Sequence, residues 1–136
     1  MANKKIEEIE GIGPVLGEKF TSAGVPDTDT LLDKGCTKSG RKGIADATGI
    51  SESRVLTFVN MADLFRINGV AGEYAELLVC SGVDTVKELK MRNAANLAEK
   101  LAEVNEEKKL TRKVPSENTL EGWIKQAGEL PPKIEH

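Results

Sequence analysis

The sequence predicts an all-α fold built from two tandem, related halves. Apolar residues recur at helical spacing along the chain, and no stretch of five or more residues alternates strictly between apolar and polar. Capping residues and glycines mark the helix ends. The same pattern of glycines and apolar residues also occurs twice, 58 residues apart. We therefore expect about eight to ten short helices that share one hydrophobic core.

The internal repeat is clearest at two glycine-containing segments. Residues 9–14 (IEGIGP) align with residues 67–72 (INGVAG), and the same offset places Gly24 on Gly82. Four further pairs keep the alignment, with an insertion before the last two: Phe20 and Leu78, Val25 and Val83, Ser51 and Ser116, Phe58 and Trp123. Self-similarity of this length indicates a duplicated unit.

The two predicted repeats are residues 1–64 and residues 65–136. Each is about 65 residues long, which is too short to bury a large core alone, so we expect a shared core. The second repeat contains an insertion near residues 107–115 that interrupts the alignment. Insertions lie in surface loops, where functional residues are often found.

The helices of the first repeat follow from apolar spacing and from their ends. The first begins at Pro14, a favourable first helical position, carries Leu16 and Phe20 on one face, and ends before Gly24. Three more follow: a short one after Asp27, one containing Ile44, and one capped by Ser51 with the stripe Val55, Phe58, Val59 and Ala62.

The second repeat predicts the same order of helices. Its elements are a helix with Tyr74, Leu77 and Leu78 before Gly82, a short turn from Asp84, a helix after Asn93 with Leu97, Leu101 and Val104, and a helix capped by Ser116 with Leu120, Trp123, Ile124 and Ala127. The aromatic residues thus read as core residues rather than as surfaces that stack on bases.

The composition argues against several kinds of active site. Cys36 and Cys80 are the only cysteines and His136 is the only histidine, so four ligands for a structural zinc ion are absent. Nucleophile–histidine catalysis would depend on the last residue of the chain. We expect no catalytic constellation, no metal and no cofactor. The chain has no run of about 18 apolar residues and no apolar leader, which predicts a cytoplasmic protein without a membrane span.

Residues 9–14, with the helix that ends at Ala23-Gly24-Val25, resemble the helix-hairpin-helix motif. In that motif Gly11 and Gly13 allow a tight turn between two helices, and Ile12 fills the core. The N–H groups of the turn and the positive end of the next helix face outward, where they suit a phosphate. The resemblance implies contact with the nucleic-acid backbone rather than with base edges. The chain as a whole is similar to a bacterial family of uncharacterised proteins built from paired helix-hairpin-helix units.

Two basic clusters offer countercharge for phosphates. The first basic cluster contains Lys38, Arg41 and Lys42, in the glycine-rich sequence that leads into the helix with Ile44. The second basic cluster lies at the insertion and consists of Lys108, Lys109, Arg112 and Lys113. Either cluster can bind phosphate, or it can be an exposed connector whose charges keep the protein soluble.

These observations support two hypotheses. In the first, the protein is a non-catalytic module that binds the DNA backbone independently of sequence through Gly11, Ile12, Gly13 and the basic clusters. In the second, it is a protein-interaction or scaffold domain that has lost DNA binding. Glu10 inside the first hairpin and the net charge of −3 favour the second. Convergence of both clusters beside the Gly11–Gly13 turn would favour the first. The nucleic-acid type and the oligomeric state are left open.

Overall fold

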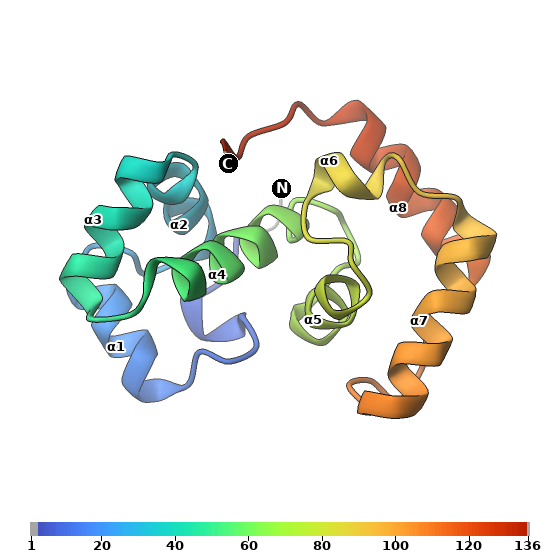
Figure 1. The fold of residues 1–136 in the computed structure, drawn as a ribbon, viewed down its shortest axis with the longest axis horizontal. Helices are drawn as coiled ribbons and strands as arrows, with labels where there is room; N and C mark the ends of the chain where they lie inside the picture. The colour runs from blue at the N-terminus through green and yellow to red at the C-terminus, as the bar shows by residue number, and fades with distance from the viewer. Residues whose placement is uncertain (1–2, 136) are drawn as a thin grey trace.

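The computed structural model describes residues 3–135, and over that range it contains eight α-helices, one short 3-10 helix and no strand. The predicted all-α class is therefore confirmed. His136, the histidine that nucleophile–histidine catalysis would require, lies outside the described residues. In chain order the elements are η1 (Ile6–Glu8), α1 (Pro14–Ser22), α2 (Thr28–Gly35), α3 (Lys38–Thr48), α4 (Glu52–Leu64), α5 (Gly72–Cys80), α6 (Val86–Leu89), α7 (Ala94–Lys108) and α8 (Glu117–Glu129) (Figure 1).

Six helices begin at a polar residue whose side chain accepts a hydrogen bond from a backbone N–H of the first turn. These N-caps are Asp27, Thr37, Ser51, Thr85, Asn93 and Ser116. The hydrogen bonds from the Thr30 hydroxyl and backbone N–H lower the pKa of the Asp27 carboxyl. The short helix expected from Asp84 begins after Thr85, because the threonine hydroxyl supplies the cap. Local sequence signals therefore set most of the helix starts.

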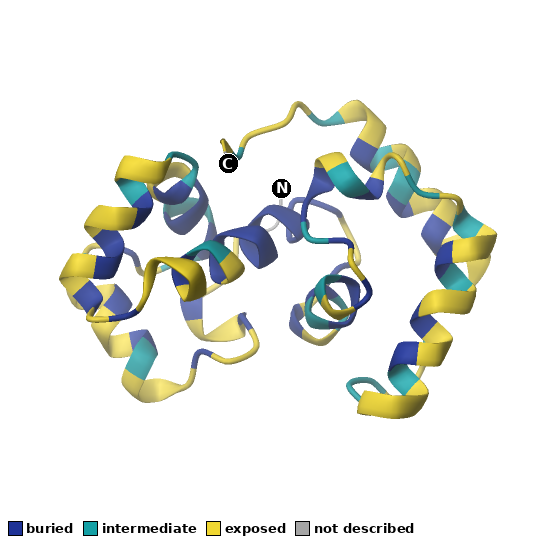
Figure 2. Cartoon of the chain, viewed as in Figure 1, coloured by how far each residue is buried: buried dark blue, intermediate teal, exposed yellow. Residues whose placement is uncertain are grey.

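Helix α4 lies at the centre of the fold and packs against α2, α3 and α5 (Figure 1). Its first three residues are exposed, whereas every residue from Phe58 to Leu64 is buried (Figure 2). A helix buried on all sides is surrounded by the core. The buried apolar residues of both halves of the chain form one continuous cluster around it.

Asp63, near the end of α4, is a buried carboxylate with both oxygens paired. Arg66 Nη1 donates to Oδ1 at 2.8 Å, and the backbone N–H of Val86, at the start of α6, donates to Oδ2 at 2.8 Å. Arg66 Nη2 also donates to the carbonyl oxygen of Pro131 at 2.8 Å. Because an unpaired buried charge costs several kcal/mol, this network joins the end of α4 to α6 and to the segment after α8.

The segment after α8, residues 130–135, runs back across the molecule to α2 and α3 (Figure 1). We call it the C-terminal strap. Lys133 forms an ion pair with Asp33 at the end of α2. The backbone N–H of Glu135 donates to the carbonyl oxygen of Cys36 at 2.7 Å. The strap thus links the end of the second half of the chain to the first half.

We expect replacement of Asp63 by alanine to lower the free energy of unfolding by about 3–5 kcal/mol, because Arg66 would keep a buried charge without its partner. Urea denaturation followed by circular dichroism measures this change. The matched control is Glu88→Ala, which breaks the partly exposed Arg92–Glu88 ion pair of 3.1 Å. That substitution should cost about 0.5 kcal/mol or less. Equal losses in the two variants would contradict the importance of the buried pair.

Candidate nucleic-acid interface

The turn before α1 comprises residues 9–13. Gly11 has a φ of +94°, and a Cβ atom built on it would lie 3.3 Å from Cε1 of Phe58. Ile12 is buried, as expected of a residue that fills the core. Gly13 has an extended backbone, with φ −90° and ψ −170°, and open space where a Cβ would lie. The conformational need for glycine, expected at both positions, therefore holds at Gly11 and not at Gly13.

The turn before α5, residues 67–71, has the same features. Gly69 has a φ of +98°, and a Cβ there would lie 3.0 Å from Nε1 of Trp123. Ala71 takes the place of Gly13, and its extended φ of −100° explains why alanine is accommodated. The replacement of the second glycine thus leaves the geometry of this turn intact.

Acidic side chains lie close to the start of α5. A Cβ on Gly72 would overlap the carbonyl oxygen of Glu8 and would lie 3.4 Å from a carboxylate oxygen of Glu10, so residues 8–10 pack against this helix end. Burial raises the pKa of Glu76 on α5, and repulsion from Glu10 raises it further, while Lys108 opposes the shift. The Glu10 carboxylate therefore places negative charge near the N-terminal end of α5.

The first basic cluster does not lie beside the turn before α1. The start of α3, where the cluster lies, and the turn before α1 are at opposite ends of the first half of the chain (Figure 1). Lys38 and Lys42 are exposed there. Arg41 is only 4% exposed, and its guanidinium donates to the carbonyl oxygens of Gly35 at 2.8 Å and of Glu135 at 2.7 Å. Arg41 therefore anchors the fold and is not among the surface cations.

The insertion predicted near residues 107–115 begins in the last turn of α7, and its remaining residues, 109–115, form a loop held by the side chain of Asn105. The amide oxygen of Asn105 accepts hydrogen bonds from the backbone N–H groups of Leu110 and Thr111 at 2.9 and 3.0 Å, and its Nδ2 donates to the Thr111 carbonyl at 3.0 Å. Lys109, with a φ of +52°, ends α7 in the left-handed conformation. The positions of the insertion's cations are thus set by its backbone.

The insertion loop lies beside the turn before α5. Lys109 and Arg112 line an open hollow of about 490 Å³ together with Glu73, in the first turn of α5. Lys113 lines a smaller hollow of about 230 Å³ with Gly69 and Trp123. Lys108 lies along α5 instead, where its positive charge acts to lower the pKa values of Glu76 and Cys80 against the effect of burial. The structure therefore brings three of the four cations of the second basic cluster to the turn before α5, a pairing that the sequence did not indicate.

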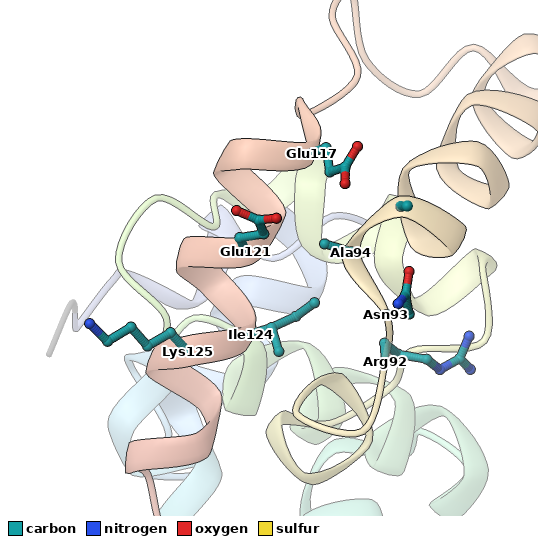
Figure 3. Close-up of a pocket in the computed structure, with 8 residues that line it drawn as sticks. Arg92, Asn93, Ala94, Glu117, Glu121, Ile124 and Lys125 are labelled. Carbon is teal, nitrogen blue, oxygen red and sulfur yellow. The ribbon is translucent and has the colours of Figure 1, made fainter.

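A third hollow, a groove of about 410 Å³, lies between the start of α7 and α8 (Figure 3). Glu117 and Arg92 lie toward opposite ends of it and Ile124 points between the two helices, whereas the Lys125 side chain points away from α7. None of these charged side chains was a sequence candidate. The groove has opposite charge at its two ends, which suits contact with another protein.

The two cysteines are free. The Cys36 thiol donates to the carbonyl oxygen of Asp33 at 3.2 Å, and burial raises the pKa of the Cys80 thiol. Over residues 3–135, no three side chains of the metal-ligating types are grouped to hold an ion. No helix in the described part of the chain is both long and apolar enough to cross a membrane.

We expect Gly11→Ala to lower the free energy of unfolding by about 1–2 kcal/mol, because alanine at this positive φ is strained. Gly13→Ala is the matched control and should change stability by less than about 0.5 kcal/mol. Urea unfolding of the two variants measures both effects. If Gly11→Ala left the free energy of unfolding unchanged, the turn would not require glycine.

Residues 10–130 match the family described as "Domain of unknown function (DUF4332)". The matched range includes residues 10–13 of the first turn, the whole second turn, both basic clusters and all eight α-helices. No curated protein and no solved structure matches the chain. Because the match spans most of the chain, the protein belongs to the DUF4332 family.

Proposed function

We propose that the chain is a duplication of a helix-hairpin-helix unit. Contacts near the two turns recur at the offset of 58 residues that the sequence shows. Three such pairs support the proposal: the positive φ of Gly24 (+84°) and Gly82 (+91°), the hydrogen bonds from Val25 N to Phe20 O (2.8 Å) and from Val83 N to Leu78 O (2.9 Å), and the bonds from Lys34 to Gly24 O (3.1 Å) and from Arg92 to Gly82 O (3.0 Å). The last pair uses a cation ten residues after the glycine in each half.

We further propose that the protein is a non-catalytic module that binds the DNA backbone without reading base sequence. The observation that carries this proposal is the position of Lys109, Arg112 and Lys113, which are exposed beside the second turn and the start of α5. Cations next to a tight turn and a helix N-terminus are suited to phosphate. Base recognition is not expected, because this site offers flexible cations and backbone.

The proposed interface is therefore centred on the second hairpin. Gly11, Ile12 and Gly13 build the first turn, but no cation of the first basic cluster lies beside them. Glu10 and Glu73, both near the start of α5, oppose an approaching phosphate. We expect weak binding for this reason, with a dissociation constant in the range of about 10⁻⁴ to 10⁻⁶ M, typical of sequence-independent contacts.

A protein-interaction domain is the second candidate. It is favoured because the two basic clusters do not converge beside the Gly11–Gly13 turn, and because Arg41 is turned inward. The groove between α7 and α8, with opposite charges at its ends, supplies a surface of the kind this role needs (Figure 3).

We expect the triple variant Lys109→Glu, Arg112→Glu and Lys113→Glu to lose binding to mixed-sequence duplexes. The affinity of the unaltered protein should fall about 40-fold between about 50 and 200 mM salt, since three phosphate contacts give a logarithmic slope of about −2.7. Fluorescence anisotropy with labelled oligonucleotides of two unrelated sequences measures both effects. The two sequences should bind equally.

The matched control carries the same change of charge at three exposed lysines outside both clusters, Lys87→Glu, Lys90→Glu and Lys100→Glu. It should bind much more tightly than the triple variant, because a local phosphate contact depends on position and not only on net charge. A separate Lys38→Glu and Lys42→Glu variant tests the first basic cluster. Absence of binding by the unaltered protein at the lower salt would overturn the proposed function in favour of the second candidate.

A further inference from the structure

The C-terminal strap is held mainly through its backbone, by two buried arginines. Arg41 and Arg66 are 4% and 8% exposed. Arg41 donates a hydrogen bond from one guanidinium nitrogen to the Gly35 carbonyl oxygen and from the other to a strap carbonyl. Arg66 donates in the same way to Asp63 Oδ1 and to a second strap carbonyl. The two carbonyls belong to Pro131 and Glu135, four residues apart in the strap. The strap therefore supplies one carbonyl acceptor to each guanidinium.

The strap's neighbours recognise an extended chain. Both backbone polar groups of Glu135 are used, with its N–H bonded to Cys36 O at 2.7 Å and its carbonyl bonded to Arg41 at 2.7 Å. Main-chain bonds of this kind bind an extended peptide, while side-chain contacts select its sequence. The Pro131-Pro132 pair favours the extended form before binding.

Side chains of the strap add selectivity. Lys133 pairs with Asp33, while Leu130 and Ile134, one on each side of the prolines and the lysine, are half-buried against the core. The pattern that the surface fits is therefore apolar–Pro–Pro–basic–apolar, with the last residue read through its backbone.

The strap nevertheless packs loosely. Pro131, Pro132, Lys133 and Glu135 are exposed, and a hollow of about 360 Å³ lies between the strap and α2, lined in part by Leu32. Protein interiors are close-packed, and segments with few buried apolar contacts open at low free energy. The receiving surface, by contrast, is built from helices α2 and α3 and the end of α4.

We propose that the surface formed by Asp33, Cys36, Arg41 and Arg66 is a peptide-binding groove for an extended segment of a protein partner with the pattern apolar–Pro–Pro–basic–apolar. The strap is its resident occupant. Because the strap is tethered, it acts at an effective concentration in the millimolar range. A partner segment that offers the same contacts and additional ones displaces it.

The test compares two redox states of one full-length variant. Glu135→Cys places a thiol on the residue whose backbone nitrogen lies 2.7 Å from the carbonyl oxygen of Cys36, so the two thiols belong to hydrogen-bonded residues. Cys80→Ser removes the other thiol, which is exposed. An added oxidant joins the two thiols and fixes the strap in the groove, and reduction returns the strap to its non-covalent contacts, from which it can be displaced. The probe is a fluorescein-labelled peptide of residues 130–135 (LPPKIE), followed by anisotropy up to millimolar protein concentration.

We expect the reduced form to bind the peptide and the oxidised form to bind it at least ten-fold more weakly. A second full-length variant, Lys133→Glu, repels Asp33 and loosens the strap without altering the groove, so it should bind the peptide more tightly than the unaltered chain. A control peptide with glutamate in place of its lysine should bind neither form.

Equal affinity of the two redox states would place the peptide elsewhere and overturn the proposal. Failure of the folded Lys133→Glu protein to bind at millimolar concentration would also overturn it, because the groove would then hold only its own strap. A dimer of the unaltered chain in light scattering that Lys133→Glu dissolves would identify a second copy's strap as the occupant and would overturn the assignment to a partner.

Discussion

The buried carboxylate of Asp63 is the constraint on which the arrangement of the second half depends. It lies in the part of α4 that the core surrounds, where a charge is tolerated only when fully paired. Arg66 and the backbone N–H of Val86 supply that pairing, and Arg66 needs the Pro131 carbonyl in turn. Satisfying one carboxylate therefore fixes the end of α4, the start of α6 and the first residues of the strap.

This network also positions the candidate interface. The second hairpin follows Arg66 directly, and α6 packs against α8, which carries Trp123 to the Gly69 turn. Helix α7 packs on both α5 and α8, so its C-terminal end delivers the insertion loop to the start of α5. The cations of the insertion thus depend on contacts remote from them. This explains why a loop can hold Lys109, Arg112 and Lys113 at one place on the surface.

Local signals predicted the helices well, and long-range contacts account for what was missed. Ser51, Ser116 and the glycines that end α1 and α5 act within a few residues, so the sequence displays them directly. The burial of Arg41 could not be read locally, because its partner carbonyl belongs to Glu135, 94 residues away. The position of the second basic cluster likewise could not be predicted from local sequence. The one available signal was that the insertion and the hairpin with Ala71 belong to the same repeat.

The differences between the two halves give the proposed duplication a physical meaning. Both keep the positive-φ glycine and the cation that binds the carbonyl of the glycine after the first helix, because the turn needs them. Their surfaces differ, because Lys109, Arg112 and Lys113 lie beside the second turn together with the carboxylates of Glu10 and Glu73. In the proposed function only the second turn contacts phosphate, without the gain in affinity that two linked sites provide. The proposed peptide groove lies on α2, on α3 and on Arg66 after α4, so that the two proposed binding activities occupy separate surfaces of one core.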